Sequence, residues 1–304
     1  MSVHRRLQPD LYSTHEHGDS AYDHSEGKAK ASSLGAAVLV TLGFSAVELL
    51  AGLAANSLAL VGSAGLMAAE STALLFALAS GLWSRHGADE DHSFGHGRLE
   101  ALAAFANGVA MAVLSLWVLA ESLLRLFSPE PVAGGIVAAV SAAGLLVASG
   151  ALIILFRSGK ASGRSALLFS AVLAGPAAAL ASGFSSLLGG PVSADPGLAL
   201  ALVALLAVSI ARIFRGSCRV LLDAVPDGVS YEAVGDAISA VPGILRVHDL
   251  HVWTMAPGHG AIQCHVLIRD PGSWPVVLDQ VRITMKGEFG IDHIAVQPEW
   301  EDRE

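Results

Sequence analysis

The sequence has little charge and few aromatic residues. Asp, Glu, Lys and Arg together make up 15% of its 304 residues and aromatic residues 6%, whereas hydrophobic residues reach 53%. The mean hydropathy is +0.57. This composition excludes an ordinary soluble globular protein. The apolar residues are mainly Ala, Gly, Leu and Val, a mixture that suits membrane helices packed closely through small side chains.

Several functional classes lack their usual sequence signals. The two cysteines, Cys218 and Cys264, do not form a disulfide framework, so we expect free thiols in a reducing compartment. The chain has no nucleophile paired with a base, no phosphate loop and no cofactor motif, which argues against an enzyme. A net charge of -9 without a basic stripe argues against nucleic-acid binding. The first residues lack an apolar core, so we expect no cleavable signal peptide.

Six apolar segments are long enough to cross a membrane as helices, which takes about 20 residues each. They lie near residues 33–55, 57–83, 99–127, 132–156, 165–189 and 195–222. We therefore predict a six-helix transmembrane domain in residues 33–222. Residues 1–32 have few apolar groups and are predicted to be a disordered tail. Their histidines, His15, His17 and His24, either bind metal loosely or only belong to a disordered segment.

The basic residues predict the orientation of these helices, because cytoplasmic loops are enriched in Lys and Arg. They fall before the first segment, in alternate connections and after the last segment: Arg5, Arg6, Lys28, Lys30, Arg85, Arg98, Arg157, Lys160, Arg164, Arg212, Arg215 and Arg219. The remaining connections hold none. We therefore expect both termini in the cytoplasm and, without a targeting segment, a bacterial inner membrane.

Residues 226–300 have the mixed composition of a soluble domain. Helical periodicity is found in DGVSYEAVGDAISAVPGI and WPVVLDQVRITMKGEF. Three other stretches are typical of strands: LRVHDLHVWTM, AIQCHVLIRD and IDHIAVQPEW. The turn APGHG joins the first two strands. The order α-β-β-α-β predicts a small two-layer α+β domain of ferredoxin-like type on the cytoplasmic side.

The connection after the second apolar segment carries the clearest metal-ligand pattern. In DEDHSFGH, Asp89, His92 and His96 combine one carboxylate with two imidazoles four residues apart, a donor set that suits zinc. A water or Asp91 would complete four ligands. The alternative is a solvated polar loop whose histidines cap nearby helices.

The C-terminal region offers a second set of donors. They are His248, Asp249, His251, His265, His293, Gln297 and Glu299. Because alternate residues of a strand share a face, His248 and His251 point in opposite directions unless a bulge intervenes, and only one of them can join His265. A metal site is one interpretation, and surface histidines that cap the sheet are the other.

Three acids lie within the apolar segments: Glu48, Glu70 and Glu121. An ionised carboxylate inside a bilayer is costly, so each is expected to face the bundle interior and to pair, protonate or bind a cation. Glu48 and Glu121 are interpreted as structural hydrogen-bonding groups near helix ends. Glu70 is the deepest, with Ser63 on its face but Leu66 one turn before it. Glu70 alone cannot build a divalent-cation site.

Three stretches together resemble a known family: NSLALVGSAGLMAAESTALLFALASGLWS, DHSFGHGRLEALAAFANGV and VHDLHVWTMAPGHGAIQCHV. The chain resembles the cation diffusion facilitators, membrane transporters that move zinc and related divalent metals in exchange for protons. The resemblance implies a homodimer, a transport site on the second and fifth helices, and a cytoplasmic domain that dimerises and senses metal. It also implies metal-ligand roles for the Asp89, His92 and His96 loop and for His265, with a partial match at Gln297 and Glu299.

The transport site departs from the family pattern. The two ligand positions of the second helix fall on Leu66 and Glu70, and those of the fifth helix on Phe169 and Leu173. Ser63 replaces a further acid. Since apolar side chains cannot compensate zinc for its lost water, tetrahedral zinc transport is doubtful. Backbone carbonyls released by Pro176 are alternative ligands.

Three hypotheses follow. The first is a divalent-cation transporter with an altered pathway, in which Glu70 carries protons or helps a partly hydrated ion, aided by Ser63, Ser170 or carbonyls near Pro176. The second is a transport-deficient homologue that acts as a metal-responsive or structural partner, including a heterodimer with a paralogue. The third is a different substrate, such as a monovalent cation or a proton.

Overall fold

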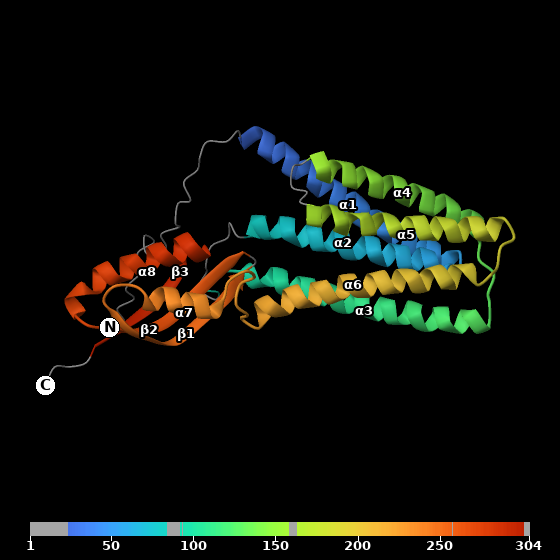
Figure 1. Ribbon diagram of the computed structural model, residues 1–304. Helices are drawn as coiled ribbons and strands as arrows, with labels where there is room; N and C mark the ends of the chain where they lie inside the picture. Colours follow the sequence, from blue (N-terminus) through green and yellow to red (C-terminus); the bar gives the residue numbers. More distant parts are fainter. Residues whose placement is uncertain (1–23, 84–91, 93, 158–162, 257, 301–304) are drawn as a thin grey trace, which may run out of the picture.

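The computed structural model describes residues 24–83, 92, 94–157, 163–256 and 258–300, and within these ranges the side chains of 24–34, 77–83 and 163–171 are not described. Six long helices come first in the chain: α1 (His24–Ala54), α2 (Leu58–Trp83), α3 (Gly97–Phe127), α4 (Gly134–Arg157), α5 (Gly163–Leu187) and α6 (Ala194–Leu221). A smaller α+β domain follows and extends the molecule at one end of the helix bundle (Figure 1).

Helices α1 to α6 correspond to the six predicted segments. Five of them contain a described apolar stretch of 19 to 31 residues, long enough to cross a membrane, and the described apolar part of α5 is Val172–Leu187. Helix α1 begins at His24 rather than near residue 33, so residues 24–32 are helical instead of disordered. This stretch contains two alanines and two lysines, residue types that favour helices.

Helix α2 is the centre of the bundle. It packs against α1, α3, α5 and α6, and all its residues from Leu58 to Met67 are buried. The carboxylate of Asp195, at the start of α6, caps α2 by accepting hydrogen bonds from the backbone N–H of Leu58 at 2.7 Å and of Ala59 at 3.4 Å. Its other oxygen accepts from Ser57 and Ser182, each at 2.6 Å. Asp195 thus joins α2, α5 and α6 at the end of the bundle farthest from the C-terminal domain.

Helices α4 and α5 approach each other closely at that same end. A Cβ added to Gly183 of α5 would lie 2.6 Å from the backbone nitrogen of Ala138 of α4. A Cβ added to Gly134 would lie 2.8 Å from the Gly183 carbonyl oxygen. Glycine therefore allows the two backbones to touch here.

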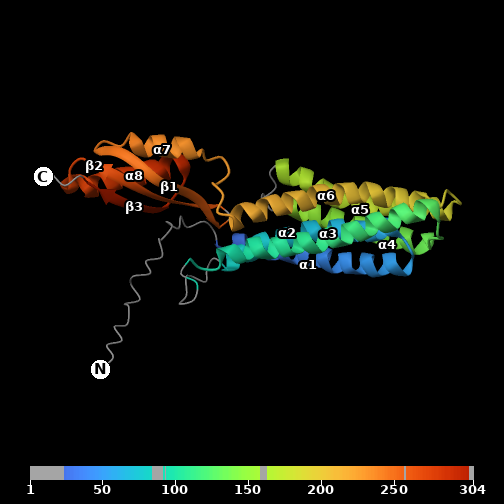
Figure 2. The same cartoon turned by 90° about the horizontal axis from the view of Figure 1, so that it is seen from below.

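The C-terminal domain has the predicted order: α7 (Tyr231–Ser239), β1 (Ile244–Ala256), β2 (His259–Ile268), the short 3-10 helix η2 (Pro271–Ser273), α8 (Trp274–Phe289) and β3 (His293–Glu299). Strand β2 is central, antiparallel to β1 and parallel to β3. Both helices contribute to one apolar core with β2 residues such as Cys264 and Val266, so they cover the same face of the sheet (Figure 2). The predicted fold class is confirmed.

The junction between the two domains is short and polar. Arg98 of α3 forms an ion pair with Asp223, which follows α6. The backbone N–H and the hydroxyl of Thr254 in β1 both donate to the Ala224 carbonyl, at 3.0 and 2.9 Å. These contacts hold β1 against the ends of α3 and α6.

Candidate functional site

Glu70 lies on the side of α2 that faces α6. Its side chain is half-buried, and its Oε1 accepts a hydrogen bond from the Ser209 hydroxyl of α6 at 2.8 Å. The Arg212 guanidinium donates to the same Ser209 oxygen at 3.3 Å. Leu66, one turn before Glu70, is fully buried against Leu202 and Leu206 of α6. The ligand position at residue 66 is therefore filled by core packing.

A cavity of about 560 Å³ lies between the helix bundle and the C-terminal domain. Ala73 of α2 and Arg212 of α6 both line it. Each lies three residues after a member of the Glu70 and Ser209 pair. Toward the C-terminal domain it is lined by charged groups that include Glu100, Arg219 and Asp227. The cavity lining is mainly apolar, with these charged groups at its edge, and the Glu70 and Ser209 pair lies about one turn from the lining residues Ala73 and Arg212.

Ser63 does not contact Glu70 directly. It is fully buried and donates from its hydroxyl to Glu48 Oε2 of α1 at 2.8 Å. A Cβ added to Gly175 of α5 would lie 3.0 Å from the Ser63 hydroxyl, so α5 approaches closely at this point. Ser63 and Glu70 share α2 but are held by different partner helices.

The ligand positions of α5 are only partly described. Leu173 packs with Met67 of α2 and Ala148 of α4, away from the α6 residues that surround Leu66. Phe169 and Ser170 belong to α5, but their side chains lie outside the described part of the structure. Among the described side chains, no carboxylate or histidine forms a hydrogen bond with Glu70, whose partner is Ser209.

The loop before α3 is described only in part. Asp89 and Asp91 lie outside the described residues. The rings of His92 and His96 are close, with centroids 4.5 Å apart, so these two of the predicted ligands lie together. His96 is the N-cap residue of α3 without a capping hydrogen bond from its side chain, so helix capping does not account for it. The neighbouring Phe94 contacts the ring of His293 on β3, with centroids 6.3 Å apart.

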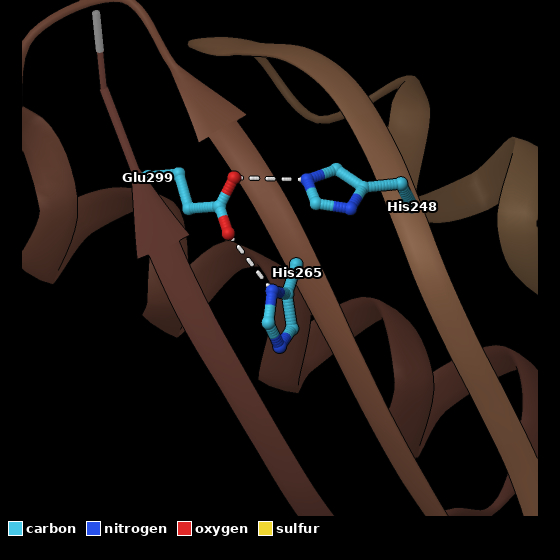
Figure 3. Close-up of side chains that lie close together, drawn as sticks. All are labelled: His248, His265 and Glu299. Atoms are coloured by element: carbon cyan, nitrogen blue, oxygen red, sulfur yellow. Dashed lines mark hydrogen bonds and ion pairs between the residues drawn. The ribbon is translucent and has the colours of Figure 1, made fainter.

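Three predicted ligands of the C-terminal domain meet on the open face of the sheet (Figure 3). Glu299 of β3 lies 3.0 Å from His248 Nε2 of β1 and 2.8 Å from His265 Nδ1 of β2, one carboxylate oxygen to each ring. One donor atom from each residue lies within 4.8 Å of the other two. Two imidazoles and a carboxylate are a donor set that suits zinc, with a fourth position left for water or another residue.

A bulge in β1 selects which histidine joins this cluster. The β1 and β2 register shifts between His248 and His251, and Asp249 between them has a left-handed φ of 50°. His248 pairs with His265 across the strands, whereas His251 is exposed and contacts Asp249 at 3.1 Å. Gln297 is opposite His265 in β3 but is exposed and outside the cluster of three.

The electrostatics of this cluster favour an ionised carboxylate. Hydrogen bonds from His265, and then from His248, lower the pKa of Glu299 below its ordinary value. On the opposite face of β2, burial raises the pKa of the Cys264 thiol to about 11. Cys264 is therefore a neutral core residue, and the candidate metal ligands lie on the open face.

Two carboxylates are buried in the helix bundle. Glu48, expected from the sequence to be a structural hydrogen-bonding group, accepts a bond from Ser63, and Asp195 is one for which the sequence analysis makes no prediction. Ser209, the partner of Glu70, was also missed. An acid within or beside a charge-free segment was the available signal for the two carboxylates, whereas a serine in an apolar helix carries none.

Comparisons with known proteins agree with this architecture. Residues 34–222 match the cation efflux transmembrane domain, and residues 226–301 match the cation efflux protein cytoplasmic domain. The zinc transporter ZitB of Escherichia coli is 30% identical over 267 residues, which cover 86% of this chain and 85% of ZitB. The cadmium, cobalt and zinc/H(+)-K(+) antiporter of Bacillus subtilis is 29% identical over 291 residues, 92% of each chain.

Among solved structures, the metal-bound C-terminal domain of the CzcD transporter from Cupriavidus metallidurans is 30% identical, with a TM-score of 0.22, and covers 23% of this chain and 99% of that domain. The transmembrane match spans more than half of the chain, and the likeness to ZitB spans most of both proteins. This chain is therefore a multi-pass membrane protein, not an enzyme, and belongs to the cation efflux family, the cation diffusion facilitators.

Proposed function

We propose that this protein exports divalent metal cations of the zinc type in exchange for protons, by alternating access, through an atypical site centred on Glu70. The observation that carries this proposal is the position of the Glu70 and Ser209 pair near the 560 Å³ cavity. The names of the ZitB and Bacillus relatives, a zinc transporter and a cadmium, cobalt and zinc antiporter, support the class of substrate.

The donors at this site are oxygens. Glu70 and Ser209 supply a carboxylate and a hydroxyl, while Leu66 supplies nothing, so a bound cation keeps part of its water shell. Ser170 and carbonyls near Pro176 are further proposed donors. Since carboxylate, carbonyl and water ligands suit harder ions than imidazole and thiolate do, we expect the preference for zinc over manganese to be weaker than at a site with histidine.

The two other metal sites are proposed to be regulatory. Asp89, His92 and His96 would hold a metal at the loop before α3, and His248, His265 and Glu299 would hold one in the C-terminal domain. Zinc bound at the second site would draw β1, β2 and β3 together on the open face. We propose that this domain senses metal, that the protein acts as a homodimer in a bacterial inner membrane, and that both termini are cytoplasmic, as the Lys and Arg distribution predicts.

A second candidate function is that of a transport-deficient subunit that partners a competent paralogue. The full burial of Leu66 against Leu202 and Leu206 favours it, because this packing leaves no space for a ligand at that position. Under this alternative the loop and C-terminal metal sites stay intact while the membrane domain carries no ion.

Metal flux into liposomes that contain the purified full-length protein separates the two functions. We would offer zinc, manganese, iron, cobalt and cadmium to the wild type, Glu70→Ala and Glu121→Gln. Glu121→Gln is the control, because Glu121 pairs with Arg125 of the same helix α3 at 3.0 Å. An active transporter predicts flux that falls about tenfold or more in Glu70→Ala and is kept in Glu121→Gln. A folded wild type that carries none of the five ions favours the partner subunit.

A further inference from the structure

The carboxylate of Glu48 is the most deeply enclosed acid among the described membrane helices. The residue is 0% exposed, within an apolar span of α1. Its Oε2 accepts the hydrogen bond from Ser63, but its Oε1 has no hydrogen-bond partner within the described residues. A buried polar atom left without a partner calls for a functional or chemical explanation.

The surroundings of Glu48 contain no compensating charge among the described residues. An added Cβ at Gly144 of α4 would overlap Glu48 Oε1 and would lie 3.1 Å from the Phe44 ring, so α4 and α1 close the site from two sides. Ser63 contributes from α2, and Gly175 of α5 lies behind it. None of these groups titrates. An ionised carboxylate here would lose its hydration without a cation in return, whereas a protonated one avoids that cost.

A row of polar side chains, here called the polar track, lies between Glu48 and the end of the bundle next to the C-terminal domain. Thr41, Ser45 and Glu48 lie at i, i+4 and i+7 on one face of α1, and all three are buried. Thr41 and Ser71 line a narrow cavity of about 10 Å³, space for roughly one water molecule. Val172 of α5 also lines it, and its carbonyl lacks a helical donor because Pro176 has no N–H. Because the Thr41 and Ser45 hydroxyls donate to the backbone carbonyls of Ala37 and Leu42, water that enters this track would carry the proton.

We propose that Glu48 is the proton-binding site of this transporter, separate from the metal site at Glu70, with Ser63 as its positioning residue. An O–H bond forms at Oε1 when a proton arrives along the track, and it breaks when the proton leaves to water on the other side. Ser63 and Glu70 are seven residues apart on α2 and bind α1 and α6 respectively, so α2 links proton occupancy to metal occupancy. The coupling to metal rests on the function proposed above.

Infrared spectroscopy of the reconstituted full-length protein tests the protonation directly. At neutral pH we expect a carbonyl-stretch band of a protonated carboxylic acid that is lost in Glu48→Gln and kept in Glu121→Gln. Ser63→Ala should keep the band but shift its frequency, because the hydrogen bond to Oε2 is removed. A spectrum of Glu48→Gln identical to wild type in this region overturns the proposal.

Flux measurements in the same liposomes test the coupling. A proton gradient should drive metal uptake at least tenfold faster than no gradient in wild type and in Glu121→Gln, but not in Glu48→Gln, while metal-for-metal exchange without a gradient survives in Glu48→Gln. Unchanged proton-driven uptake in Glu48→Gln overturns the proposal. If wild type carries no metal, the proposed transport function fails, and the infrared band alone decides whether Glu48 holds a proton.

Discussion

Glu70 of α2 and Ser209 of α6 are joined by a hydrogen bond of 2.8 Å near the cavity between the helix bundle and the C-terminal domain. This bond ties the central helix to α6 at the proposed metal site. The Arg212 guanidinium, one turn further along α6, also donates to the Ser209 oxygen. The orientation of the carboxylate therefore depends on α6 as well as on α2.

We expect Ser209→Ala to weaken metal transport without abolishing it. Removing the hydroxyl frees the Glu70 carboxylate to rotate and deletes one oxygen donor, so KM for metal should rise by about tenfold, as for loss of one hydrogen bond to a charged group. Initial rates in liposomes over a range of metal concentrations give KM and kcat. Ser149→Ala, which removes only a bond to the Leu145 carbonyl within α4, is the control. Equal kinetics in the two variants would contradict the role of Ser209.

Leu66→His should raise zinc transport relative to manganese. It places an imidazole one turn from Glu70, where the two side chains share a helix face, and nitrogen donors favour zinc. Leu66→Ala is the matched control, because it opens the same space without adding a donor. The ratio of zinc to manganese flux, measured side by side, should increase only in the histidine variant. An equal change in both variants would attribute the effect to space alone.

His265→Ala should remove the zinc of the C-terminal domain. His265 contacts Glu299 at 2.8 Å in the centre of the three-residue cluster, so its loss leaves two donors and weakens binding by more than about tenfold. Metal analysis of the full-length protein after dialysis against a weak chelator should show less bound zinc per chain than wild type. His251→Ala, on β1 but outside the cluster, should bind as wild type does.

Asp195→Asn should destabilise the membrane domain. The Asp195 carboxylate accepts four hydrogen bonds: from Leu58 and Ala59 of α2, from Ser57 just before α2, and from Ser182 of α5. An Asn amide has one acceptor oxygen only, and its NH2 group would face groups that are themselves donors. We expect a loss of about 2 to 3 kcal/mol and a lower Tm by intrinsic fluorescence in detergent. Asp227→Asn is the control, since its side chain is 90% exposed. Equal Tm values would show that the capping bonds do not limit stability.

Gly144→Ala should disturb Glu48, whereas Gly150→Ala on the same helix should not. The added methyl group at position 144 occupies the place of Glu48 Oε1, while position 150 has no atom within 4 Å of an added Cβ. We expect Gly144→Ala to shift or remove the infrared band assigned to Glu48 and to lower Tm by several degrees. Identical spectra for the two variants would contradict this prediction, because they would show that α4 shifts to accommodate the methyl group without moving the Glu48 carboxylate.

The sequence predicts the helices and strands better than the side-chain contacts between them. Long apolar segments predict six helices because membrane crossing depends on length and composition, and the C-terminal order followed from periodicity. The contacts between Glu48 and Ser63 and between Ser57 and Asp195 depend on tertiary packing, which local patterns do not encode. The bulge at Asp249 is of the same kind, since its left-handed φ gives no clear signal in VHDLHV.

The close approach of α4 and α5 at Gly134, Ala138 and Gly183 fixes how this pair of helices can move. The backbones touch at that end, so the two helices cannot move closer together there. Toward the opposite end, the pair borders the small cavity lined by Ala148 and Val172. Two helices whose backbones touch at one end can separate more readily at the other end than at the point of contact. Opening of α4 and α5 is thus expected only at the end next to the C-terminal domain, with the glycine contact as its pivot.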